Sequence, residues 1–438
     1  MPDPRTLQAR WPRLTLDVPP VPFTIRRSWD DFVVREIPLH EPTGDGDHAL
    51  LEVEKRGVST AAAVRDLSRA LGVRPSDVGV AGLKDTRAVT VQRVSVEHVD
   101  PGAALALELP RVRVTNAWRT RRKLRTGHLA GNAFELKLRG EAAADVRLRL
   151  PDMRAVLPVL TERGIPNYFG AQRFGMRADN HRVGRALLAG DFAEAAALIA
   201  GRPEPGDAGD MLRARELFDA GRFAEAAGAW PRGNAEAARV ARAKASGRDD
   251  RGAVMATGKK LLRFYVSALQ SALFNDVLAA RVGSLDALEA GDVAWVHEGE
   301  RVFLVEDPAG DTAPGDPAGA SVAELAARGE ISPTGPLFGP RMKEPAGAQA
   351  AREAAVLEGA GLAAGDFGRR GPWGTPGGRR PLRVPGVTFD VDAGEDETGP
   401  YVRLAFSLPP GAYATAVLRE LAKGHMHVGT AREWEAGR

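Results

Sequence analysis

The 438-residue chain contains no cysteine, and this absence excludes several kinds of chemistry. Without cysteine the chain has no disulfide framework, no thiolate zinc site and no cysteine nucleophile. Long apolar segments are also missing. The longest uninterrupted apolar run is Ala195–Ala200, far short of the roughly 20 residues that a membrane-spanning helix needs. The first residues, MPDPRTLQARWPRL, lack the apolar centre of a secretory signal, so we predict a cytoplasmic protein.

Several motifs of nucleotide, metal and hydrolase sites are absent too. The nearest match to a phosphate-binding P-loop, GAVMATGKK from Gly252, has five residues between its glycines and a lysine where serine or threonine would hold magnesium. No GxGxxG motif follows a predicted strand, and neither GxSxG nor HExxH occurs. Of the eight histidines only His425 and His427 are close together. We therefore expect no metal site and no cofactor.

Composition describes a globular protein, with 44% hydrophobic and 27% charged residues, and its length suits two or three domains. The net charge is only +3, but basic residues are clustered. Residues 111–125 hold seven lysines or arginines and no acid, and further basic regions span 239–263 and 369–383. Three such blocks favour RNA or DNA as a partner. A basic run that is simply a solvated surface is the alternative for each block.

The first 160 residues alternate strand patterns with one clear helix. That helix is expected after an N-cap at Thr60 and before Gly72, with Val64, Leu67 and Leu71 on one face. Strands are expected at 78–80, 105–118 and 134–140. Another is expected at 89–96, where the alternation slips between positions 92 and 93 and predicts a β-bulge. Many strands with few helices indicate an α+β domain on an antiparallel or mixed sheet.

The middle of the chain has a different character. Residues 182–245 are alanine-rich and predict helices, including two similar stretches, GDFAEAAALIAG and GRFAEAAGAW, which we interpret as local helical hairpins. A long helix is predicted at 259–282, a β-hairpin with its turn at Glu298 and Gly299, and a Pro/Gly/Ala loop at 307–320. Strand patterns return after residue 381. The pattern predicts one sheet domain interrupted by an inserted domain.

Two residues with possible catalytic chemistry lie between two predicted strands. In VGVAGLKDTRAVTVQRVSVEHV, which starts at Val78, Lys84 and Asp85 occupy the connecting loop. Loops held by a rigid scaffold often carry catalytic groups. Aspartate is equally common as a turn residue that bonds its own backbone. On these residues alone both interpretations stay open.

Two further stretches combine aromatic, amide and basic residues. In KLRTGHLAGNAFELKLR, Phe134 is suited to stacking on a base and Asn132 to reading a base edge; the alternative is a core phenylalanine and a turn asparagine. In PNYFGAQRFG, Arg173 lies among aromatics and glycines, where a packed hinge is the alternative. The segment SALQSALFN, residues 267–275, has the periodicity of a buried helix.

Together these stretches resemble the TruD family of tRNA pseudouridine synthases. The similarity is carried by AGLKDTRAVTVQ, GHLAGNAFELKLR, NYFGAQRFG and SALQSALFNDVLAARV. It extends to DFVVREIP, TGPLFGPRM and LPPGAYATAVLREL, and the motifs run in family order from residue 25 to 421. Several long motifs in order are far more specific than one short pattern.

The resemblance implies a fold and an activity. The fold is an α+β pseudouridine-synthase domain with a mixed or antiparallel sheet, residues 1–162 and 381–438, interrupted by an inserted α/β domain at 163–380. The activity is the isomerisation of uridine to pseudouridine in tRNA, at position 13, on a base flipped out of its stack. This reaction needs no redox step, metal or cofactor, in agreement with the missing ligand clusters.

The resemblance also assigns roles to residues. Asp85 matches the nucleophile, Lys84 the lysine that holds the carboxylate ionised and oriented, and Asn132 the asparagine that helps to position Asp85. Phe134 matches the aromatic that stacks on the target uracil, and Phe32 a further aromatic near the flipped nucleotide. The residues expected to bind RNA are Arg121, Arg122, Lys123, Arg125, His128 and Arg173. The chain departs from the commoner family pattern at Thr86, often basic, and at Arg122, often asparagine.

Two other functions compete with this one. An RNA-binding chaperone of the same fold is expected to have lost the catalytic carboxylate, yet Asp85 is present. A helical scaffold built on the alanine-rich middle leaves the loop around Asp85 unexplained. Detection of pseudouridine in tRNA after incubation with the pure protein separates the enzyme from both.

Overall fold

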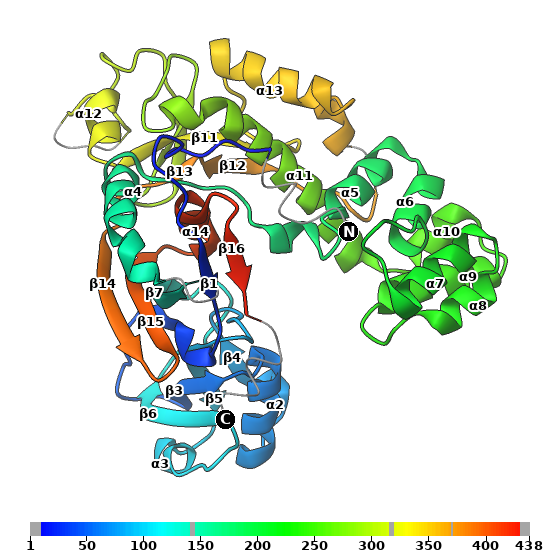
Figure 1. The fold of residues 1–438 in the computed structure, drawn as a ribbon, viewed down its shortest axis with the longest axis horizontal. Coiled ribbons are helices and arrows are strands. Elements are labelled where there is room, and N and C mark those ends of the chain that lie inside the picture. Colours follow the sequence, from blue (N-terminus) through cyan, green and yellow to red (C-terminus); the bar gives the residue numbers. More distant parts are fainter. Residues whose placement is uncertain (1–9, 141–144, 315–318, 369–370, 430–438) are drawn as a thin grey trace. The chain divides into compact units, whose positions relative to one another are not determined.

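A computed structural model describes residues 10–140, 145–314, 319–368 and 371–429 (Figure 1). The chain divides into two compact units. The unit that we call the sheet unit comprises Thr15–Ile165 and Gly386–Arg438, and the helical unit comprises Met1–Leu14 and Pro166–Pro385. The sequence prediction set the borders at 162/163 and 380/381 and grouped residues 1–14 with the sheet unit.

The sheet unit is built on a ten-stranded mixed sheet. Its main path has the order β14-β15-β7-β2-β5-β3-β6, while β1 pairs with β16 and β7, and β4 pairs with β5. Strands β2 and β5 are parallel, as are β1 and β16, whereas the neighbours of β3 and β7 on the main path are antiparallel to them. This confirms the predicted α+β class. The strands are β1 Phe23–Ile25, β2 Phe32–Pro38, β3 His48–Arg56, β4 Val78–Val80, β5 Val89–Glu97, β6 Val112–Thr120, β7 Leu129–Arg139, β14 Phe389–Asp396, β15 Gly399–Leu408 and β16 Met426–Val428.

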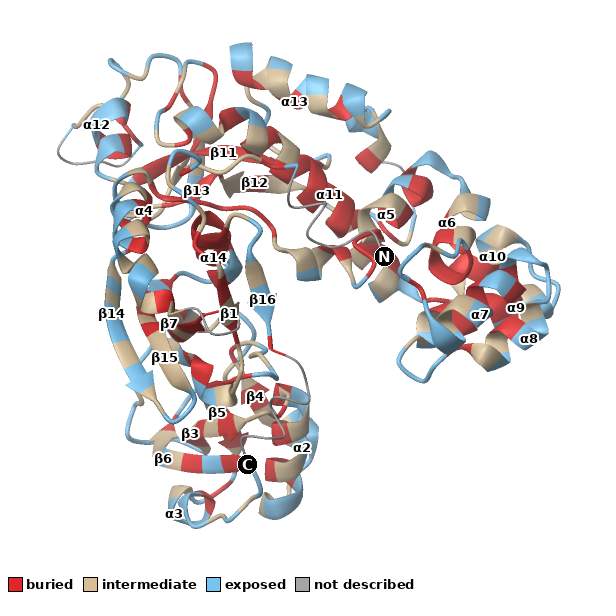
Figure 2. Ribbon diagram, in the orientation of Figure 1, coloured by how far each residue is buried: buried red, intermediate tan, exposed pale blue. Residues whose placement is uncertain are grey.

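Helices of the sheet unit pack on this framework, and Figure 2 shows the buried residues that they carry. The strand predicted at 105–118 begins later than expected, because the chain first forms a short helix and a turn before β6. The helices are α2 Thr60–Leu71, α3 Pro101–Leu105, α4 Leu150–Arg163 and α14 Ala414–Ala422, with 3-10 turns at Trp29–Asp31, Pro75–Asp77 and Val146–Arg149.

Strand β5 lies at the centre of the sheet, and the bulge predicted in it is wrong. Its pairing with β3 runs without a shift from Val89 opposite Arg56 to Glu97 opposite His48. The alternation slips because β5 is buried on both faces, so polar residues do not mark a solvent face. Gln92, only 2% exposed, accepts a hydrogen bond from the Thr60 hydroxyl at 3.1 Å instead.

The N-cap of helix α2 lies one residue before the predicted cap, Thr60. Ser59 is the N-cap, and its hydroxyl accepts a hydrogen bond from the Ala62 backbone N–H at 3.2 Å. Gly72 ends the helix in the left-handed region, at φ 67°, as the glycine predicts. Thr60 is therefore the first residue of the helix, and its buried hydroxyl is available for contacts with the sheet and the loop after β4.

The helical unit combines a group of helices with a small sheet. Its strands follow the order β10-β9-β11-β12, and its helices α5 to α10 share one apolar core with part of α11. The helices are α5 Asn180–Ala189, α6 Phe192–Ala200, α7 Gly209–Asp219, α8 Phe223–Ala229, α9 Ala235–Ala245, α10 Asp250–Met255, α11 Lys259–Arg281, α12 Val322–Ala327 and α13 Gly347–Gly359, with 3-10 turns at Ala171–Phe174, Val282–Ser284 and Ala364–Gly368. The strands are β9 Val293–Val296, β10 Arg301–Leu304, β11 Ile331–Leu337, β12 Gly378–Pro381 and β13 Arg383–Val384, and β8 Ile165–Pro166 lies at the border between the units.

Three local predictions for this unit are confirmed. The alanine-rich region is helical, and α11 is a buried helix in which Phe274 and Asn275 are both 0% exposed. The hairpin of β9 and β10 pairs Val296 with Arg301, so its turn contains Glu298 and Gly299. Part of the predicted Pro/Gly/Ala loop, residues 315–318, lies outside the described residues.

Candidate active site

Asp85 lies in the loop between β4 and β5, and this loop is fixed at several points. The Lys84 backbone N–H donates to the Thr60 hydroxyl at 3.0 Å. The Lys55 ammonium donates to the Asp85 carbonyl oxygen at 2.8 Å and to the Val58 carbonyl oxygen at 2.7 Å. The Asp85 side chain, in contrast, is 33% exposed. A fixed backbone therefore presents a carboxylate that a ligand can reach.

Lys84 has different partners from the one that the sequence suggested. Its ammonium lies 2.8 Å from a carboxylate oxygen of Glu36 and donates to the Asn132 side-chain oxygen at 2.8 Å. The Lys84 and Glu36 side chains are 4% and 1% exposed. Lys84 thus ties the loop to strands β2 and β7, and the expected direct pairing of its ammonium with the neighbouring Asp85 carboxylate is not the arrangement in the structure.

The ion-pair partner of the Asp85 carboxylate is Arg26, which the sequence did not single out. A guanidinium nitrogen of Arg26 lies 3.3 Å from the Asp85 carboxylate, and the arginine side chain is 14% exposed. The same guanidinium lies over the Phe32 ring, 3.9 Å from the ring centre. Arg26 therefore connects the carboxylate to an aromatic residue of β2 and places positive charge beside the carboxylate.

A buried ionic cluster holds the backbone next to Arg26. The Asp31 carboxylate, fully buried, accepts hydrogen bonds from the Arg27 and Ser28 backbone N–H groups at 2.9 and 3.1 Å. Arg139 pairs with Asp31 at 2.7 Å and with Asp396 at 2.8 Å. Arg26 itself has φ 58°, in the left-handed region that costs energy for a residue with a side chain. The cluster stabilises this conformation by fixing the residues that follow.

Lys55 is the most deeply buried cation of the site, at 1% exposure. Burial lowers its pKa to about 8, and the nearby Asp85 carboxylate opposes this effect. Arg26, Lys55 and Lys84 together face two carboxylates, those of Glu36 and Asp85. Positive charge is therefore in excess around the loop, which suits an anionic nucleophile and an anionic ligand.

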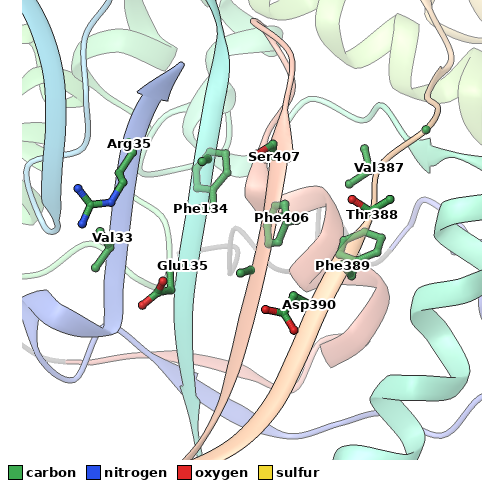
Figure 3. A pocket seen from close by; sticks show the side chains of 13 residues that line it. Val33, Arg35, Phe134, Glu135, Val387, Thr388, Phe389, Asp390, Phe406 and Ser407 are labelled. Carbon is green, nitrogen blue, oxygen red and sulfur yellow. The ribbon is translucent and has the colours of Figure 1, made fainter. Parts of the chain in front are cut away.

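Three phenylalanines on neighbouring strands form an aromatic group. Phe134 on β7 lies opposite Phe406 on β15, with stacked rings 5.4 Å apart, and meets the edge of Phe32 at 6.4 Å. Phe389 on β14 continues the row, 5.6 Å from Phe406 (Figure 3). A pocket of about 400 Å³ opens at strands β2, β7, β15 and β14, and its lining includes Phe134, Phe389 and Phe406 but not Asp85. Phe134 is 9% exposed and is one of the residues that line this pocket.

The basic residues predicted to bind RNA divide into two sets. Arg121 forms an ion pair with Asp45, and Lys123 donates to the Ser76 carbonyl oxygen at 2.7 Å. The side chains of Arg122 and Arg125 are exposed and make no ion pair or hydrogen bond among the described residues. Residues 125–128 lie beside the candidate catalytic loop, since the backbone N–H of residue 127 donates to the carbonyl of residue 81 at 2.8 Å, and the His128 ring accepts from the Arg125 backbone at 3.4 Å.

Arg173 belongs to the helical unit and is packed there. Its guanidinium donates to the Ser271 hydroxyl at 3.0 Å and lies 5.6 Å from the centre of the Phe169 ring. The basic block at 369–383 is partly internal as well, because Arg379 pairs with Glu353 at 2.7 Å within the core of this unit. Positions 369 and 370 of the block lie outside the described residues. Buried arginines present no charge at a surface, so this block is a weaker candidate for RNA contact than its composition indicates.

The site residues that the sequence left out all lie far from the loop in the sequence. Arg26 precedes β2, Glu36 lies near its end, Lys55 lies near the end of β3 and Phe406 is on β15. Glu36 falls in the motif DFVVREIP and Phe406 shortly precedes the motif LPPGAYATAVLREL. Their positions in or beside family motifs were therefore a signal that could have identified these two residues. For Lys55 the available signal was a lone lysine in an alternating strand.

Within the described ranges, no group of three or more histidine, aspartate or glutamate side chains is placed to hold a metal ion. None of the helices described by the structure is long and apolar enough to cross a membrane.

Comparisons with known proteins relate the chain to one family of enzymes. The family model of tRNA pseudouridine synthase D (TruD) matches residues 12–421. A tRNA pseudouridine synthase D of Geobacter metallireducens is 44% identical over 94% of this chain and 97% of its own, and that of Geobacter sulfurreducens is 41% identical over 94% and 96%. A crystal structure from Methanosarcina mazei, described as a TruD protein, superimposes with a TM-score of 0.79 at 27% identity, over 95% of this chain and 97% of the other.

The fold and the relatives together define a class of enzyme, the RNA-modifying isomerases that make pseudouridine. Within that class, the chain belongs to the tRNA pseudouridine synthase D (TruD) family.

Proposed function

We propose that the protein isomerises uridine to pseudouridine at position 13 of tRNA, with Asp85 as the nucleophile. The observation that carries the proposal is the Asp85 carboxylate itself, one third exposed on an anchored loop and paired with Arg26 at 3.3 Å. An aspartate of an ordinary turn needs neither a buried lysine under its carbonyl nor a stacked arginine at its carboxylate. The family relatives are named for this reaction on tRNA.

The reaction can be written with these residues in place. The Asp85 carboxylate attacks C1′ of the target ribose, and the electron pair of the C1′–N1 bond leaves with the uracil. The uracil rotates, its C5 attacks C1′, and the ester bond to Asp85 breaks. The proton lost from C5 is balanced by one gained at N1. Arg26 orients the carboxylate for its attack and pairs with it again once the ester bond has broken.

The remaining residues support binding of the flipped base. Phe134, with Phe32 and Phe406 around it, provides an aromatic surface on which a uracil can stack, a contact worth about 1–3 kcal/mol per base in single-stranded binding. Asn132 accepts a hydrogen bond from Lys84, so it supports the position of Asp85 through the loop rather than by direct contact. Arg122 and Arg125 are the cations best placed to neutralise phosphates near the loop.

The test is incubation of an unmodified tRNA transcript with the purified protein, followed by mapping of pseudouridine. The proposal predicts stoichiometric conversion at position 13 and none in a transcript with cytidine there. Tight tRNA binding without pseudouridine at any position would instead identify an RNA-binding protein that lacks catalysis.

A further inference from the structure

Leu83 is an exposed leucine in the candidate catalytic loop. Its relative exposure is 82%, the largest among the exposed large hydrophobic residues of the described chain. The backbone on both sides is fixed: Ala81 is 1% exposed, and the Lys84 N–H is bonded to the Thr60 hydroxyl at 3.0 Å. Leu83 is thus held out into solvent by a rigid support.

A single exposed leucine is ordinary, but the position of this one is not. Leu83 precedes Asp85 by two residues, so their Cα atoms are at most about 7 Å apart at the extension limit of a chain. Successive nucleotides of one strand rise by about 3.4 Å in a stacked duplex. When a target ribose reaches Asp85, Leu83 is therefore within one or two base steps of the gap that the flipped base leaves.

Apolar side chains can insert between bases, and in that position they offset part of the few kcal/mol that unstacking costs. The charges nearby fit an RNA strand at this place, since Arg125 is exposed on the adjoining loop and its neighbour at position 127 is bonded to the backbone of the catalytic loop.

We propose that Leu83 is a wedge that enters the RNA base stack where the target uridine leaves it, and so favours the flipped state. This inference rests on the proposed function, because it requires a flipped uridine at Asp85. Leu83 acts on the stacking equilibrium and takes no part in bond breaking.

The experiment compares the wild type with Leu83→Ala, Leu83→Met and the control Leu148→Ala, which removes another leucine of the sheet unit that is 78% exposed. Single-turnover rates are measured on two tRNA transcripts, one intact and one with an abasic nucleotide beside the target uridine. The abasic neighbour weakens stacking, so flipping no longer needs a wedge.

The expected result is a loss of roughly tenfold for Leu83→Ala on the intact tRNA, as unstacking assistance of about 1.4 kcal/mol would give. On the abasic tRNA the same variant should react within about twofold of wild type. Leu83→Met should keep most of the rate on both substrates, and Leu148→Ala should match wild type.

Equal slowing of Leu83→Ala on both RNAs would overturn the wedge, and so would an unchanged rate on the intact tRNA. A second readout avoids chemistry altogether: in an Asp85→Asn background, fluorescence of 2-aminopurine next to the target should rise on binding, and less so when Leu83→Ala is added. An equal rise in both proteins also rejects the wedge. A wild-type protein that makes no pseudouridine at all contradicts the proposed function instead, so the two failures are distinguishable.

Discussion

The buried Lys84–Glu36 pair predicts an unusually large loss of stability when one partner is removed. In Glu36→Gln the Lys84 ammonium, 4% exposed, loses the opposite charge that lies 2.8 Å away. Removing one partner of a buried ion pair typically costs about 3–5 kcal/mol. For a unit of roughly 200 residues, 1 kcal/mol lowers the melting temperature by about 2–4 °C, so the expected drop is about 6–20 °C.

A double-mutant cycle shows whether the pair itself causes the loss. Lys84→Met should be destabilising by a similar amount, since it leaves the Glu36 carboxylate, 1% exposed, without its cation. The double variant Lys84→Met/Glu36→Gln removes both charges, so we expect it to be more stable than either single variant. Its activity should stay low, because a methionine in place of Lys84 cannot donate to Asn132 and the loop loses its tie to β7.

The assays are thermal and denaturant unfolding of the full chain, together with single-turnover rates on tRNA. If the losses in melting temperature of the two single variants simply add in the double variant, the two residues are not coupled. That result would refute the claim that Lys84 and Glu36 stabilise the protein as a buried pair. A double variant with wild-type activity would contradict the positional role of Lys84.

Three further predictions concern base stacking, RNA binding and pH. Phe134→Leu keeps a large apolar side chain, so the melting temperature should change little while the rate of pseudouridine formation falls strongly. A variant rate equal to that of wild type would mean that the Phe134 ring only packs in the core and does not stack on the base. Changing Arg122 and Arg125 to alanine should make the slope of log K for tRNA against log salt shallower by roughly one to two units, whereas Arg121→Ala, whose side chain already pairs with an aspartate, should change it less. An unaltered slope would mean that Arg122 and Arg125 lie on a solvated surface and contact no phosphates. The Lys55 ammonium, with its pKa lowered to about 8, should give a rate that falls above about pH 8 as the bond to the Asp85 carbonyl weakens. The contribution of Lys55 to the free energy of unfolding should instead rise between about pH 8 and 10.5, because the unfolded chain there binds the proton more tightly. Lys55→Met should abolish the pH dependence of both the rate and the stability. If the pH profiles of this variant match those of wild type, Lys55 is not the group that causes them.

Local patterns in the sequence predicted much of the fold. Helix α2, the hairpin of β9 and β10 and the long helix α11 follow from periodicity and from glycine at turns and caps. Strand β5 shows where this reasoning fails. Alternating apolar and polar residues mark a strand with one solvent-exposed face, but a central strand covered on both faces lacks this signal. In β5 the apparent break in alternation at Gln92 therefore predicted a bulge that does not exist.

The candidate site was predictable only in part. Motif resemblance selected Asp85, Lys84, Asn132 and Phe134, and the structure gathers them in the sheet unit. It could not assign their partners, because adjacency in sequence does not decide where a long side chain points. Lys84 reaches across to Glu36, and the charge at Asp85 comes from a residue far earlier in the chain, Arg26. Contacts of this kind depend on strand order, which no local pattern specifies.

The most direct test of the central claim is the single-turnover rate of Asp85→Asn on tRNA. The substitution removes the anion and keeps the shape, while tRNA affinity depends mainly on phosphate contacts elsewhere. We predict no detectable pseudouridine, a tRNA dissociation constant within a few-fold of wild type and an unchanged melting temperature. Asp66→Asn, which alters a surface aspartate of α2 that pairs with Arg69, should react like wild type. An Asp85→Asn protein that keeps more than a few per cent of the wild-type rate would contradict the assignment of Asp85 as the nucleophile.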